Sequence, residues 1–80
     1  MLEQDLRHET TKWLERLEKE KGGVKVLNSK GQEFMNNIKA YTSDSKYFLD
    51  KGDLIRAFEC VVWAWAWLEI GFDLHLMEKI

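Results

Sequence analysis

The chain has 80 residues, of which 45% are hydrophobic and 32% charged, and it contains no proline. This composition is typical of one small folded helical domain, residues 1–80, and excludes a disordered chain. With 12 basic and 14 acidic side chains the net charge is −2, which makes nucleic acid an unlikely partner. A domain this small can bury a large fraction of its surface only with very efficient packing or with a partner chain.

The cysteine content and the apolar runs indicate a cytoplasmic protein. Cys60 is the single cysteine, so no intramolecular disulfide can form, and no cysteine or histidine spacing matches a structural zinc site. The first residues lack the basic start and apolar core of a signal peptide. The longest apolar run, residues 60–68, is far shorter than the ~20 residues that cross a bilayer. We therefore expect no membrane contact, no metal and no cofactor.

The first predicted helix covers residues 2–20. Its apolar residues recur at helical spacing, with charged residues on the other side, and they are Leu2, Leu6, Trp13 and Leu17. Gly22 and Gly23 follow this helix and are expected to end it, because glycine accepts the left-handed conformation at a helix carboxyl terminus.

The second predicted helix covers residues 26–50, and its start is open between residues 24 and 29. Val24, Val26 and Leu27 can open this helix, whereas Ser29 with Gln32 resembles a capping box. Its apolar stripe includes small residues that let a neighbouring helix or ring approach closely. The stripe consists of Leu27, Gly31, Phe34, Ile38, Tyr41, Ser45 and Phe48.

The third predicted helix covers residues 54–78 and follows a turn at Gly52, with Asp53 as its N-cap. A helical wheel divides its apolar residues into two nearly opposed stripes. The predicted core stripe consists of Leu54, Phe58, Val61, Trp65, Leu68, Phe72 and Leu76. The predicted interface stripe consists of Trp63, Trp67, Ile70, Leu74 and Met77.

A helix with two apolar stripes must be covered on both sides. We expect an antiparallel three-helix up-down bundle of the all-α class, in which the first two helices cover the core stripe. A homodimer contact along the third helix would then cover the interface stripe, and Trp and Met are enriched at interface centres. In the alternative, the first helix wraps far enough to bury these indoles.

The acidic residues Asp44, Asp53 and Glu69 are interpreted as caps and tertiary hydrogen-bond acceptors. Glu69 and Asp73 are four residues apart on one helix face, where paired structural carboxylates are more common than a general acid or a metal ligand. No residue set resembles a nucleophilic, acid–base or phosphate-binding motif, so no catalytic residue is predicted.

Three groups of residues between positions 41 and 74 form a recognisable pattern: Tyr41, Ser43, Asp44, Tyr47 and Phe48; Lys51, Gly52, Asp53, Ala57 and Phe58; and the run Trp65, Ala66, Trp67, Leu68, Glu69, Ile70 and Gly71. This pattern resembles an archaeal family known as domain of unknown function 357. Glu69 stands where this family more often has aspartate. The resemblance implies an archaeal cytoplasmic three-helix bundle and supplies no reaction, but it places Asp44, Asp53 and Glu69 at acidic positions of the family.

These observations favour a non-enzymatic protein-interaction module that self-associates as a dimer through its third helix, with a further unidentified protein partner open. The alternative is an accessory or RNA-associated protein of nucleic-acid metabolism. A peptide binder of the helical-repeat kind is disfavoured, because such units need stacked neighbours and this chain holds one.

Overall fold

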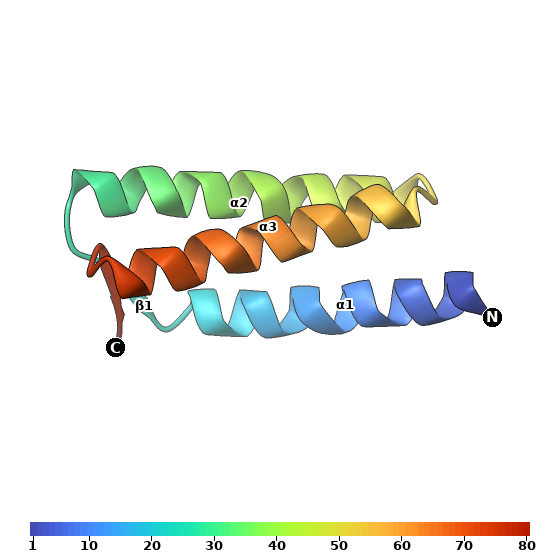
Figure 1. The fold of residues 1–80 in the computed structure, drawn as a ribbon, viewed down its shortest axis with the longest axis horizontal. Helices are drawn as coiled ribbons and strands as arrows, with labels where there is room; N and C mark the ends of the chain where they lie inside the picture. Colours follow the sequence, from blue (N-terminus) through green and yellow to red (C-terminus); the bar gives the residue numbers. More distant parts are fainter.

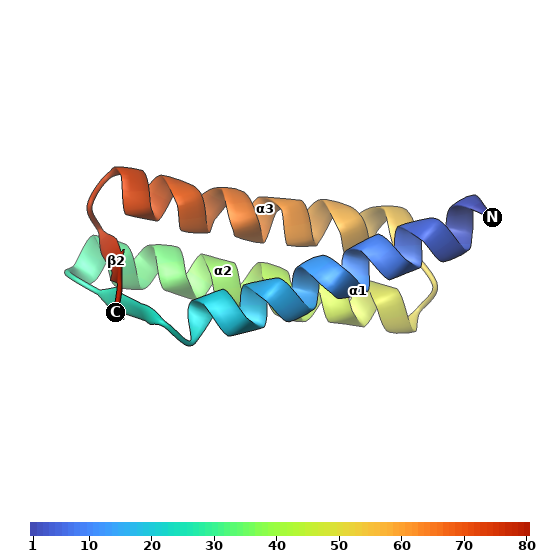
Figure 2. The ribbon, with the colours of Figure 1, turned by 90° about the horizontal axis from the view of Figure 1, so that it is seen from below.

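The computed structural model describes residues 1–80 and contains three antiparallel helices, α1 (Leu2–Lys21), α2 (Ser29–Asp50) and α3 (Leu54–Asp73). Two short strands, β1 (Val24–Val26) and β2 (Met77–Lys79), lie together at one end of the bundle (Figures 1 and 2). The molecule is elongated, with extents of 42 × 18 × 17 Å. The predicted fold class and three-helix bundle are confirmed. None of the three helices has the length and apolar character to cross a membrane.

The third helix ends at Asp73, five residues before the predicted end. His75 adopts a left-handed conformation with φ of 57°, and the amide of Leu76 donates to the carbonyl of Gly71 at 2.9 Å. This Schellman motif reverses the chain. Residues 77–79 then pair with β1 in antiparallel register, with Met77 opposite Val26.

The second helix begins at Ser29, later than predicted, because residues 24–26 form β1. Its N-cap is Asn28, whose side chain accepts a hydrogen bond from the amide of Gly31 at 2.9 Å. The helix therefore begins at the late end of the predicted range 24–29, with Asn28 rather than Ser29 as its cap. Valine at positions 24 and 26 suits an extended strand, since β-branched side chains pack well on a pleated surface.

The two glycine turns differ from each other. Gly22 caps α1 in the right-handed helical region with φ of −65°, so the predicted left-handed end is absent there. Gly52, between α2 and α3, has φ of 78°, and its amide donates to Leu49 while the next amide, of Asp53, donates to Phe48. A second Schellman motif therefore ends α2 and turns the chain tightly into α3.

The core stripe of α3 is rotated from the predicted one. Its buried residues are Ala57, Val61, Ala64, Leu68 and Gly71, and only Val61 and Leu68 were predicted among them. The helical wheel assumed that α3 is covered from one side, whereas α3 lies between α2 and α1 and packs against both (Figure 1). The buried arc therefore lies between the two flanks, with small residues at the centre and rings beside them.

Candidate functional site

Three large apolar side chains, two of α3 and one of its C-cap residue, remain in contact with solvent on the flank nearer α2. Trp63 is 56% exposed, Ile70 46% and Leu74 59%, and we call these three residues the Trp63 face. Tyr41 of α2 stacks against Trp63 with ring centroids 6.4 Å apart and an interplanar angle of 21°. This stacking orients the indole of Trp63 while leaving more than half of its side chain exposed.

The other two residues of the predicted interface stripe lie elsewhere. Trp67 is half-buried and forms a T-shaped pair with Phe34, with ring centroids 4.7 Å apart, and its indole N–H is buried with no acceptor. Met77 is 1% exposed and belongs to the core. It lies on β2 rather than on α3, and its methyl group occupies the space beside Gly71 that a side chain would need.

Trp65 lies on the opposite flank and joins α3 to α1. Its indole N–H donates to the backbone carbonyl of Trp13 at 3.1 Å, and the two rings meet edge to face at 5.7 Å. The guanidinium of Arg16 lies 5.0 Å from the Trp13 ring, a cation–π distance. The first helix therefore covers one tryptophan of the run, Trp65, and does not wrap round to cover Trp63.

A hollow of about 450 Å³ lies between α1 and α3, and we call it the α1–α3 groove. Its lining is apolar except for one carboxylate, and it consists of Trp13, Phe58, Val61, Val62, Trp65, Ala66 and Glu69. This groove was not predicted, because Phe58 and Trp65 were both assigned to the core stripe. The available signal was Val62 and Ala66, two apolar residues outside both predicted stripes.

The three acidic residues singled out from the sequence do not come together. Asp53 caps α3 by accepting from the amide of Arg56 at 3.3 Å. Asp44 is exposed on α2 near Cys60, and Glu69 lies at the rim of the α1–α3 groove. No three histidine, cysteine, aspartate or glutamate side chains of the chain converge on a point where a metal ion could bind.

Cys60 is a partly buried free thiol. Burial raises the pKa of this thiol, and the negative charges of Asp44 and Glu59 raise it further. The thiolate is the nucleophilic form of cysteine. A raised pKa keeps Cys60 protonated at neutral pH, so this side chain is suited to packing rather than to nucleophilic attack.

Comparison with known proteins places this bundle in a family. Residues 9–77 match the model of a protein family of unknown function, DUF357. The chain belongs to the DUF357 family. The crystal structure of protein AF1782 from the archaeon Archaeoglobus fulgidus, assigned to the same family model, is 55% identical and superposes with a TM-score of 0.91. That similarity covers 100% of both chains.

The predicted family resemblance is therefore confirmed, and the matched region extends beyond residues 41–74 to include most of α1 and β1. The chain matches none of the curated proteins. The family description carries no activity.

Proposed function

We propose that this DUF357 protein is a non-enzymatic protein-interaction module that self-associates through the Trp63 face. The observation that supports the proposal is the exposure of Trp63, Ile70 and Leu74 along one flank of α3, beside the buried arc that packs against the other two helices. Tryptophan is prominent among the residues that dominate binding energy at protein interfaces. Exposure of such a residue beside two aliphatic side chains marks a surface for contact with protein.

The area of the Trp63 face determines how strong self-association can be. An aromatic side chain buries about 150–250 Å², so half-exposed Trp63 with the smaller Ile70 and Leu74 presents at most on the order of 300 Å². Two copies would then bury roughly 600 Å² from these residues alone, which is below the range of stable dimers. Self-association should therefore be weak and visible only at tens of micromolar protein.

The dispersal of reactive groups supports a role without catalysis. The carboxylates of Asp44, Asp53 and Glu69 lie on different surfaces, and the thiol of Cys60 has a raised pKa. A general acid–base pair needs two titratable groups close to one substrate position. The arrangement of these four side chains does not supply such a pair.

Sedimentation equilibrium over a range of protein concentrations tests the proposal. The wild-type protein should show a dimer, and Ile70→Glu should be monomeric because it places a charge at the centre of the Trp63 face. The matched control is Ile55→Glu, on the same helix at a 66% exposed position away from this face, and it should keep the wild-type association. A strictly monomeric wild-type protein at tens of micromolar would refute self-association.

A further inference from the structure

We propose that two copies of the chain pair through the Trp63 face with their α3 helices antiparallel, so that Trp63 of each copy packs against Ile70 of the other. This inference rests on the proposed self-association and adds the orientation of the two copies. Two features of the face carry it: the charges differ between its two ends, and its apolar residues are spaced about a point near the middle of the contact.

The end of the Trp63 face towards the start of α3 carries two carboxylates. Glu59 precedes Trp63 by four residues on α3, and Asp44 follows Tyr41 by three residues on α2. Each carboxylate therefore lies one turn from the stacked Tyr41–Trp63 pair. The negative charges of both raise the pKa of the Cys60 thiol, so both lie close to the same point. Neither carboxylate forms an ion pair.

Neighbouring charged residues do not change this assignment. Arg56 lies one turn before Glu59 but already pairs with Asp53 at 3.6 Å. With 3.6 residues per helical turn, Glu59 lies about 40° from the centre of the Trp63 face, whereas Asp73 and Glu69 lie about 80° and about 120° from it, towards the α1–α3 groove. Glu59 is therefore the carboxylate of α3 that is closest in direction to the exposed indole.

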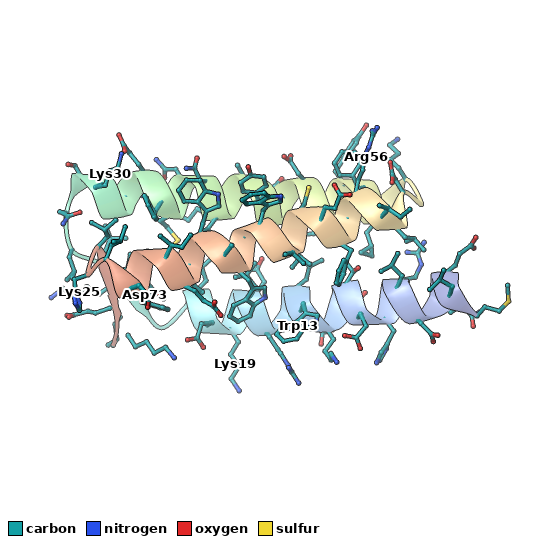
Figure 3. All side chains as sticks on the ribbon, in the orientation of Figure 1. Trp13, Lys19, Lys25, Lys30, Arg56 and Asp73 are labelled. Atoms are coloured by element: carbon teal, nitrogen blue, oxygen red, sulfur yellow. The ribbon has the colours of Figure 1, made fainter.

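The opposite end of the Trp63 face is balanced in charge. There α2 begins beside the segment that follows α3, since a Cβ on Gly31 would overlap the carbonyl of Leu76. Lys30 forms an ion pair with Glu33 at 3.1 Å at this end. Figure 3 shows Lys30 at this end of the bundle and Arg56 at the other. The face is thus acidic where α3 begins and balanced where α3 ends.

This difference favours the antiparallel pair. Parallel copies would bring the two carboxylates of each copy together at one end, and like charges facing each other across an interface disfavour a complex. Antiparallel copies place each acidic end beside the balanced end of the other copy. A two-fold axis near residue 67, midway between Trp63 and Ile70, then lays each indole on an aliphatic side chain, and it lets the two α3 helices overlap along most of their length.

Distances between spin labels on the full chain test the orientation. Cys60→Ala removes the native thiol, and Ile55→Cys or Asp73→Cys then supplies one labelling site near either end of α3. In the antiparallel pair the two labels should be separated along the helix axis by about 36 Å at position 55 and by about 18 Å at position 73, from a rise of about 1.5 Å per residue. In a parallel pair both distances should be similar and below about 25 Å, because packed helices lie about 8–10 Å apart.

The outcomes separate this inference from the proposed function. Sedimentation equilibrium of the labelled samples reports self-association itself, and the distances are measured well above the dissociation constant found there. Dimers whose labels at position 55 lie below about 25 Å would overturn the antiparallel arrangement and leave self-association standing. Monomers in every sample, including unlabelled wild-type protein, would overturn both.

Neutralising the acidic end provides a second test that needs no label. The double variant Glu59→Gln/Asp44→Asn should leave the dissociation constant within about twofold of wild type, because the antiparallel pair keeps the acidic ends apart. The control Glu15→Gln/Asp50→Asn makes the same change in net charge beside the hollow between α1 and α2 and should also leave it unchanged. Association strengthened about tenfold or more by the first variant alone would show that the carboxylates face each other, and the antiparallel arrangement would be wrong.

Discussion

Replacing His75 by glycine should stabilise the protein. His75 is exposed and has φ of 57° at the end of α3, within a Schellman motif whose two hydrogen bonds measure 2.9 and 3.0 Å. A left-handed conformation destabilises a residue with a Cβ by roughly 1–2 kcal/mol, and glycine removes this strain. Glycine also has greater freedom in the unfolded chain, which offsets about 0.5–1 kcal/mol of the gain. The net gain for His75→Gly should be about 0.5–1 kcal/mol, with the helix end unchanged.

The opposite change, from glycine to alanine at position 52, should destabilise the protein. Gly52 has φ of 78°, and an added Cβ would meet no atom within 4 Å, so Gly52→Ala should cost about 1 kcal/mol from backbone strain alone. Gly22→Ala is the control at a right-handed helical φ of −65° and should not destabilise. Urea unfolding followed by circular dichroism measures all three, and 1 kcal/mol corresponds to about 4–8 °C in Tm. If His75→Gly lowers stability while Gly52→Ala behaves as expected, the strain assigned to His75 is wrong.

Four further substitutions test the packing and the ion pair between α1 and α2. Gly31→Ala should cost more than about 2 kcal/mol in thermal unfolding, because its Cβ would overlap a backbone carbonyl of the segment after α3. Lys46→Gln should cost about 0.5 kcal/mol at pH 7, the scale of an exposed pair. Lys46 lowers the pKa of Glu18 below 4.5, so in urea titrations this difference should persist above that pH and disappear as the pH falls through the folded-state pKa. Trp65→Phe should destabilise more than Trp67→Phe in chemical unfolding, since only Trp65 loses a hydrogen bond and Trp67 loses an unpaired buried donor.

The sequence predicted the number of helices and the turn at Gly52 because those depend on local signals. Apolar residues at helical spacing define each helix, and glycine followed by an acidic cap defines the turn. The end of α3 depends on a non-local contact, since the apolar pattern continues through Leu76 and Met77. Those residues leave the helix because β2 pairs with β1, some fifty residues earlier in the chain.

The surfaces of α3 were predicted less well than its existence. Hydrophobicity alone ranked Trp65 above Ala64 as a core residue, yet Ala64 is fully buried and Trp65 half-buried. A wheel shows which residues share a side, but not how many neighbouring helices the side meets. Trp67 and Met77 were therefore assigned to the interface stripe although α2 covers the first and β2 carries the second into the core.

Small residues at the centre of the buried arc explain why α3 carries two accessible surfaces. Ala57, Ala64 and Gly71 recur every seven residues and face α2, where the hydroxyl of Ser45 reaches the carbonyl of Ala57 at 2.7 Å. Helices that approach this closely leave no room for rings between them, so the indoles lie on the two flanks. On one flank α1 covers Trp65 only partly, which leaves the α1–α3 groove. On the other flank α2 covers the indole of Trp67 and leaves that of Trp63 exposed. The close approach of α2 and α3 therefore accounts both for the dense core and for the two accessible surfaces.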